Sequence, residues 1–116
     1  MARAILLAAI VCLLAAPTAT AHHERIHSDQ ERAKVIILKV FGPKYGPQAL
    51  AVSWCESKWY RFAGYGKHQY LGLFQMGNYA RSRYGHGNGA WKQARAAYAY
   101  FVDSGRDWSP WTCKPW

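Results

Sequence analysis

Acidic residues are scarce in this chain, which has six Asp and Glu against fifteen Lys and Arg. Glu56 is the only acid between Glu31 and Asp103, and its neighbours are basic and aromatic. A lone carboxylate beside rings such as those of Trp54 and Trp59 can keep its proton closer to neutral pH than a solvated one. We therefore consider Glu56 the candidate acid. The competing interpretation is a glutamate at the exposed end of a helix.

Several motifs with a known chemistry are missing. The chain has no internal repeat, P-loop, dinucleotide-binding fingerprint or Gly-x-Ser-x-Gly elbow, so nothing points to nucleotide binding or to that type of serine nucleophile. Neither a Cys-x-x-Cys nor a His-x-x-x-His spacing surrounds the later cysteines, and we expect no metal and no cofactor. His22, His23 and His27 are close enough in sequence to bind a metal, but a flexible leader is the favoured interpretation.

Long hydrophobic runs are missing except at the N-terminus, where Ala4 to Ala16 is apolar. This run is too short for a comfortable membrane span. Arg3 precedes it and Ala19-Thr20-Ala21 follows it, which is typical of a secretory signal peptide over residues 1–21. We expect a protein that is secreted, periplasmic or held in the cell wall, without stable membrane insertion. An uncleaved anchor is the alternative.

Cysteine is also rare, with three in the whole chain. Cys12 leaves with the predicted signal peptide, so Cys55 and Cys113 can pair in only one way. Export makes their oxidation to a disulfide the expected outcome. Closing a loop of that length stabilises a small domain by roughly 4 kcal/mol in the chain-entropy description.

Positive charge dominates, with a formal net charge of +9. Such a protein is attracted to polyanions: nucleic acid, anionic lipid or bacterial wall polymers. Export argues against nucleic acid as the partner. The alternative is that the charge serves solubility alone.

The first helix is expected after a polar leader, residues 22–28, which we predict to be frayed. Ser28-Asp29-Gln30-Glu31 has the pattern of a capping box and opens a helix through about Phe41. Gly42-Pro43 is expected to end it. Apolar residues recur along this segment at helical spacing: Val35, Ile36, Leu38 and Val40.

Pro47 suits the first turn of a second helix, at whose C-terminal end Glu56 falls. The negative pole of that helix disfavours the ionised carboxylate. Nearby Lys58 and Arg61 favour it, so the sequence leaves the size of any pKa shift open.

Glycines and aromatic residues alternate irregularly over residues 59–76, which predicts a small β-hairpin or a tight loop. The tail from Asp107 onward should fold back onto the helices, because Cys113 must reach Cys55. The expected fold class is α+β and mainly α, in one domain over residues 29–116. A short helix, a connection and a third long helix are predicted at residues 78–84, 85–89 and 91–102.

Five short segments carry a combined pattern: Cys55-Glu56-Ser57, Gly72-Leu73-Phe74-Gln75, Arg95-Ala96-Ala97-Tyr98, Ser104-Gly105 and Trp108-Ser109-Pro110-Trp111. Together they resemble the soluble lytic transglycosylase-like domains of the lysozyme superfamily. The closest variant is the short, secreted, single-disulfide type, similar to the catalytic domains of actinobacterial resuscitation-promoting factors and of some phage tail lysins. The likeness runs over about residues 47–111. Its specific part is Glu-Ser followed by Gly-Leu-Phe-Gln.

The resemblance implies a lysozyme-like fold with a groove that binds the glycan strands of peptidoglycan. It implies that Glu56 is the catalytic acid, that Ser57 supports it or the local turn, and that Gln75 contacts the sugar. Many members carry Ala-Tyr-Asn on a later helix, but here no asparagine follows Tyr98. We expect Gln93 to supply that amide, and we place Tyr98 in the groove with Ser57 and Gln75 as a substrate-binding residue.

The resemblance also implies a lytic transglycosylase, in which one acid protonates the leaving oxygen and then acts as a base. Most glycosidases need a second carboxylate, whereas here the muramyl 6-hydroxyl of the substrate closes an anhydro ring. Two alternatives stay open. One is a hydrolytic lysozyme, with Asp103 or Asp107 folded near the groove, and the other is a non-catalytic basic wall-binding or antimicrobial protein. We expect a monomer.

Overall fold

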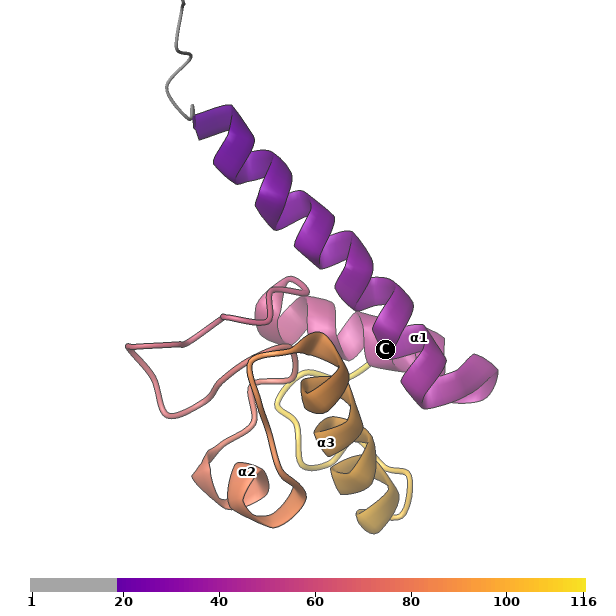
Figure 1. Ribbon diagram of the computed structural model, residues 1–116. Coiled ribbons are helices and arrows are strands. Elements are labelled where there is room, and N and C mark those ends of the chain that lie inside the picture. Colours follow the sequence, from indigo (N-terminus) through magenta and orange to yellow (C-terminus); the bar gives the residue numbers. More distant parts are fainter. Residues whose placement is uncertain (1–18) are drawn as a thin grey trace, which may run out of the picture.

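The computed structural model describes residues 19–116, so residues 1–18 of the predicted signal peptide lie outside the described range. Within that range the chain is mainly helical, as predicted, with α1 (Ala19–Ser57), α2 (Asn78–Tyr84) and α3 (Ala90–Asp103). Figure 1 shows the end of α1 gathered with α2, α3 and the loops, while the first part of α1 extends away from them. No helix in this part of the chain is long and apolar enough to cross a membrane.

A break at Gly42 divides α1 into two segments. Its φ of 76° and ψ of 179° lie outside the helical range, in a region that glycine adopts far more readily than other residues. Pro43 follows, and its fixed φ and missing N–H suit the first turn of the next segment. The predicted end at Gly42-Pro43 is confirmed, but the second segment begins directly after the break and not at Pro47.

The start of α1 corrects the prediction of a frayed leader. Residues 22–28 are helical and α1 begins at Ala19, so Ser28 lies inside the helix and is not its N-cap. A capping box serves N–H groups that have no helical partner, and here the preceding turn supplies those partners. The Asp29 carboxylate instead accepts two bonds of 3.0 Å from Nε of Arg61, which ties α1 to the following loop.

Aromatic rings fill the centre of the core. Phe41, at the end of the first segment of α1, stacks on Phe74 and Trp108 with ring centroids 5.5 and 5.6 Å away. Trp108 also packs on Phe101 of α3 at 4.4 Å. The small side chains of three alanines of α3 are buried and allow close approach: Ala94, Ala96 and Ala97.

The buried face of α1 differs in part from the expected stripe. Val35 and Leu38 are 51% and 41% exposed, so these two predicted core positions face outward. Ile36 is buried as expected. In the part of α1 before Gly42, three buried residues were not singled out by the pattern: Ala33, Ile37 and Phe41.

Residues 59–76 form a tight loop, and not a hairpin of regular strands. In the described chain the strand-like pairing is limited to one bridge between Leu71 and Met76, whose main-chain bonds are 3.2 and 3.0 Å long. Main-chain bonds within turns hold other parts of it, for example from Tyr65 N–H to the Phe62 carbonyl at 3.1 Å, and a bond of 2.9 Å from Gly72 N–H to the Ala63 carbonyl joins two segments of the loop. The loop form of the prediction is therefore the one that the structure adopts.

The later elements agree closely with prediction. α2 spans the predicted residues 78–84, and α3 extends the prediction of 91–102 by one residue at each end. The tail folds back as expected, and Cys55 and Cys113 form a disulfide across 58 residues. Such a disulfide is typical of proteins that fold in an oxidising compartment.

Candidate active site

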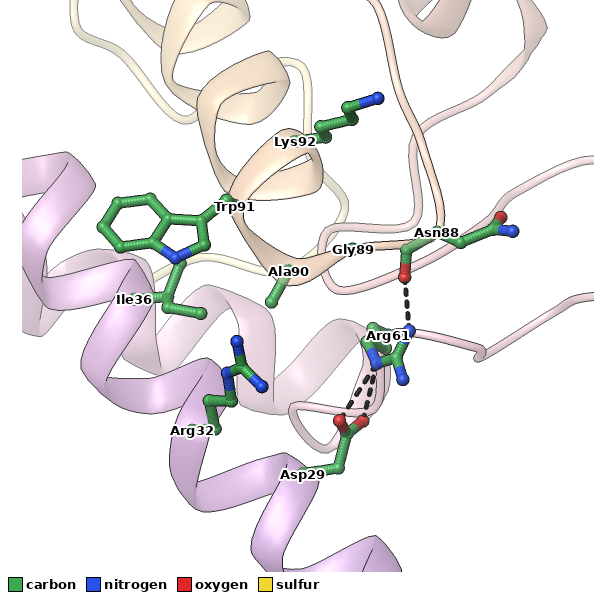
Figure 2. Close-up of a pocket in the computed structure, with 9 residues that line it drawn as sticks. All are labelled: Asp29, Arg32, Ile36, Arg61, Asn88, Gly89, Ala90, Trp91 and Lys92. Atoms are coloured by element: carbon green, nitrogen blue, oxygen red, sulfur yellow. Dashed lines mark hydrogen bonds and ion pairs between the residues drawn. The ribbon is translucent and has the colours of Figure 1, made fainter.

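A cavity of about 600 Å³ lies between the first part of α1 and the start of α3 (Figure 2). It is lined by basic and aromatic side chains that include Arg32 and Trp91. Asp29 is the sole carboxylate among the described residues of this lining, and Arg61 binds both of its oxygens. Both oxygens of Asp29 are thus engaged by the guanidinium of Arg61, and Glu56 does not line this cavity.

Glu56 lies one residue before the end of α1 and is half-buried. Its Oε1 accepts a hydrogen bond of 3.1 Å from the main-chain N–H of Cys113. The preceding residue, Cys55, is bonded covalently to the same Cys113. The end of the helix and the folded-back tail therefore meet at this carboxylate.

Burial raises the pKa of Glu56 above its ordinary value of 4.5. The N–H of Cys113 and the positive charge of Lys114 act in the opposite direction, but removal from water is the larger effect. The carboxylate also stands at the C-terminal pole of α1, which disfavours its ionised form. This is the direction that a general acid requires, because the proton must be present near the working pH.

Glu56 opens into a small cavity of about 240 Å³, which Tyr70, Gln75, Trp111 and Thr112 help to line. A second cavity, of about 400 Å³, shares Tyr70, Gln75 and Trp111 with the first and continues past the start of α2. We call the two together the Glu56 groove. Two further tyrosines line its second part: Tyr79 and Tyr100.

Ser57 supports the wall of this groove from behind. It is only 8% exposed, and its hydroxyl donates to the Leu73 carbonyl at 2.8 Å and to the Ser53 carbonyl at 3.1 Å. Ser53 donates to the same Leu73 carbonyl at 2.8 Å. The expectation that Ser57 supports the local turn is met. The expectation that it binds substrate is corrected, because its hydroxyl is buried and engaged within the protein.

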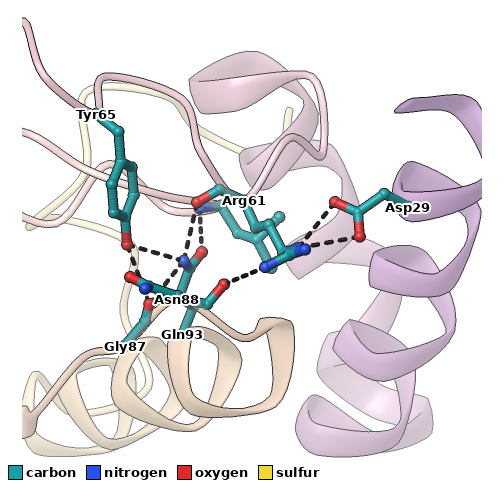
Figure 3. Close-up of polar contacts among 7 residues, drawn as sticks. Asp29, Arg61, Tyr65, Gly87, Asn88 and Gln93 are labelled. Carbon is teal, nitrogen blue, oxygen red and sulfur yellow. Dashed lines mark hydrogen bonds and ion pairs between the residues drawn. The ribbon is translucent and has the colours of Figure 1, made fainter. Parts of the chain in front are cut away.

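Gln93 holds the same loop from the other side, and its predicted contact with substrate is likewise corrected. The side chain is 1% exposed, and its Oε1 accepts a bond of 2.9 Å from the N–H of Leu73. Its Nε2 donates to the carbonyls of Arg61 and Gly87 at 2.9 and 2.8 Å (Figure 3). A side chain that is almost fully buried and bonded on both amide atoms within the protein positions the loop.

Gln75 is the predicted binding residue that the structure brings to Glu56, since both line the smaller cavity. Its main chain has a φ of 45°, which few non-glycine residues adopt. Its Nε2 donates to the carbonyls of Ala63 and Gly72, both at 3.0 Å. The amide nitrogen is therefore committed to the loop, and any contact with a ligand falls to the oxygen.

Tyr98 lies away from Glu56, which corrects its predicted place in the groove. Its ring packs edge-on against Phe41 at 5.3 Å. It lines a different cavity, of about 600 Å³, together with Tyr84 and Asp103. Tyr98 is therefore a packing residue at the edge of the core.

The other candidate carboxylates are also outside the groove. Asp103 accepts a short hydrogen bond from the Tyr84 hydroxyl, and Asp107 accepts one of 2.5 Å from the N–H of Ser109. Among the residues that the structure describes, Glu56 is the sole carboxylate lining either part of the groove. No group of three metal-binding side chains occurs in the described chain.

Comparison of the chain with family models, curated proteins and solved structures finds no match in any of the three. The expected lysozyme-like fold therefore rests on the motif resemblance alone and stays a prediction.

Tyr70, Trp111 and Thr112 line the smaller cavity together with Glu56, but the sequence did not single them out as binding residues. The Trp-Ser-Pro-Trp segment marked the tail as part of the pattern, and the disulfide required it to return to Glu56. Those two signals together would have placed Trp111 and Thr112 beside the acid. No local signal distinguishes Tyr70 from the other tyrosines of the loop.

Proposed function

We propose that this protein is a lytic transglycosylase that cleaves the β-1,4 bond between N-acetylmuramic acid and N-acetylglucosamine in peptidoglycan. Glu56 is the acid and then the base. The observation that carries the proposal is a half-buried carboxylate with a raised pKa, standing as the one described acid in a groove lined by aromatic rings. The motif resemblance over residues 47–111 supports the same assignment.

The reaction needs one carboxylate. Glu56 gives its proton to the glycosidic oxygen, and the bond from that oxygen to the muramyl C1 breaks. The muramyl 6-hydroxyl then attacks C1, and Glu56 takes the hydroxyl proton, which returns the acid to its starting form. No water is consumed. A hydrolytic enzyme would instead need a base to activate water, and Asp103 and Asp107 do not line this groove.

The groove offers suitable surfaces for a glycan strand. Tyr70 and Tyr79 are 51% and 70% exposed, and both line the part of the groove that leads from Glu56 toward α2. Sugar rings pack their C–H faces on exposed aromatic rings. Gln75 lines both cavities, and its amide oxygen is able to accept a hydrogen bond from the N–H of an N-acetyl group.

The remaining properties agree with an extracellular wall enzyme. Positive charge attracts the protein to the anionic polymers of bacterial walls, and the Cys55–Cys113 disulfide suits an oxidising location. We propose that the protein is secreted and acts as a monomer on peptidoglycan, without nucleic acid, metal or cofactor.

The test compares Glu56→Gln with the unchanged protein on purified, insoluble peptidoglycan. General acid–base assistance contributes about 10²–10⁴-fold to such reactions, so the variant should bind the polymer and release no soluble fragments. Glu31→Gln, an exposed carboxylate of α1, is the matched control and should release them normally. If Glu56→Gln releases fragments as fast as the unchanged protein, Glu56 is not the catalytic acid. If the unchanged protein binds without any release, a non-catalytic wall-binding role replaces the proposal.

A further inference from the structure

The disulfide joins two residues that both adjoin the candidate acid. Cys55 precedes Glu56 in α1, and the main-chain N–H of Cys113 donates to the Glu56 carboxylate. A crosslink that served only to close a long loop could stand anywhere along the helix and the tail. At this place it also fixes a hydrogen-bond donor relative to the carboxylate.

Other contacts anchor the tail through the side chains of Trp108, Trp111 and Lys114. Trp108 and Trp111 are buried, and Nε1 of Trp111 donates to the Phe74 carbonyl at 2.9 Å. The Lys114 ammonium donates to the carbonyls of the same turn, including that of Trp108 at 2.9 Å. Thr112 is exposed and Cys113 is half-buried, and the disulfide adds a covalent restraint to the stretch of main chain that reaches Glu56.

The helical core does not depend on this crosslink for its contacts. Ile37, Val52 and Phe101 are fully or almost fully buried in the core cluster, to which Cys113 contributes only from its edge. Loss of the disulfide should therefore make the end of the tail more mobile without unfolding the helices.

We propose that Cys55 and Cys113 are positioning residues of the site, whose disulfide holds the N–H of residue 113 on Glu56 and closes the groove wall formed by Trp111 and Thr112. Without it, Thr112 and residue 113 swing away, and the carboxylate loses both its donor and part of its shield from water. The effect on turnover rests on the proposed function, whereas the effect on residue 113 does not.

The test compares the double variant Cys55→Ser/Cys113→Ser with the unchanged protein by amide NMR over a pH series. In the unchanged protein the amide proton of residue 113 should be protected from exchange and should shift as Glu56 ionises, because it donates to that carboxylate. In the double variant both properties should vanish, while the amides of Ile37, Val52 and Phe101 stay protected. Glu56→Gln is the reference that removes the pH-dependent shift.

Two further variants separate the disulfide from the charge beside it. Lys114→Met removes a tail anchor and keeps the crosslink, so the amide of residue 113 should remain protected and coupled to Glu56. Lys39→Met, at an exposed position of α1, is the matched control. Loss of the coupling in Lys114→Met would assign the positioning role to the lysine and overturn the proposal.

Turnover gives the second readout. Misplacement of a catalytic group costs about 10²-fold for a shift of about 1 Å, so kcat of the folded double variant should fall by about that factor. A disulfide that only stabilised the fold would leave kcat unchanged and residue 113 still coupled to Glu56, which would overturn the proposal. Global loss of amide protection would overturn it too. If the unchanged protein shows the coupling but cleaves nothing, the proposed function fails and the positioning role stands.

Discussion

The hydroxyl of Ser57 lies 2.8 Å from the carbonyl oxygen of Leu73 and donates to it. This bond joins the residue after the candidate acid to the loop that ends in Gln75, so the two halves of the motif pair hold each other in place. The pairing of Glu-Ser with Gly-Leu-Phe-Gln therefore has a structural reason. The bond between Ser57 and Leu73 sets the distance between Glu56 and the opposite wall of the groove.

The shared carbonyl of Leu73 makes the two serines interdependent. Ser57→Ala and Ser53→Ala should each reduce the free energy of unfolding by about 1 kcal/mol, because the other hydroxyl still serves the carbonyl. The double variant should lose more than the sum, since a buried acceptor left without either hydroxyl costs about 1–3 kcal/mol. Urea denaturation of the four proteins measures the coupling, with Ser82→Ala at an exposed site as control. Strict additivity would show that the bonds act independently.

Gly72 and Gly85 form a matched pair that separates backbone strain from collision. Their φ angles are 82° and 87°, but a Cβ on Gly72 would lie 2.5 Å from Oε1 of Gln93, whereas one on Gly85 would meet nothing within 4 Å. Gly85→Ala should cost about 1–3 kcal/mol from strain alone. Gly72→Ala should cost clearly more, because it also displaces the amide that binds Leu73. Equal losses in thermal unfolding would contradict the close approach of Gln93 to this glycine.

The raised pKa of Glu56 makes a prediction about stability and pH. A carboxyl whose pKa is higher in the folded state stabilises the fold below its ordinary value of 4.5, and that contribution is lost as pH rises through the folded pKa. Glu56→Gln should therefore melt at a higher temperature than the unchanged protein at neutral pH, and the gain should shrink as pH falls toward 4.5.

Glu31→Gln controls for the loss of one negative charge from a basic protein. If Glu56→Gln raises the melting temperature by the same amount as Glu31→Gln at every pH, burial does not disfavour the ionised form of Glu56.

Local signals predicted most of the helical architecture. Gly42 ends the first segment because its backbone leaves the helical range, and the alanines of α3 mark the face that packs closely. The predicted start of α1 was wrong because a capping box indicates only a possible helix start. When the helix begins earlier, the side chains of the capping box are available for other partners. The Asp29 carboxylate accepts a hydrogen bond from Arg61 instead.

The candidate site was predicted in part. Glu56 and Gln75 lie in one groove because each belongs to a motif whose main chain forms the wall. Gln93 and Tyr98 were assigned to the groove from the motif resemblance, and neither lines it in the structure. A motif match gives a position in the sequence, but it does not show whether the side chain meets the groove or the core. The full set of bonds made by Gln93 depends on three separate loop segments, and these meet only in the folded chain.

The central claim is that Glu56 acts without a second carboxylate, and the products of digestion test it most directly. Purified peptidoglycan is digested with the unchanged protein, Asp103→Asn and Asp107→Asn, and the muropeptides are weighed by mass spectrometry. All three proteins should give chains that end in 1,6-anhydro-muramic acid, each lighter by one water than the hydrolysis product. Reducing ends, together with one inactive aspartate variant, would show a two-carboxylate lysozyme and contradict the account.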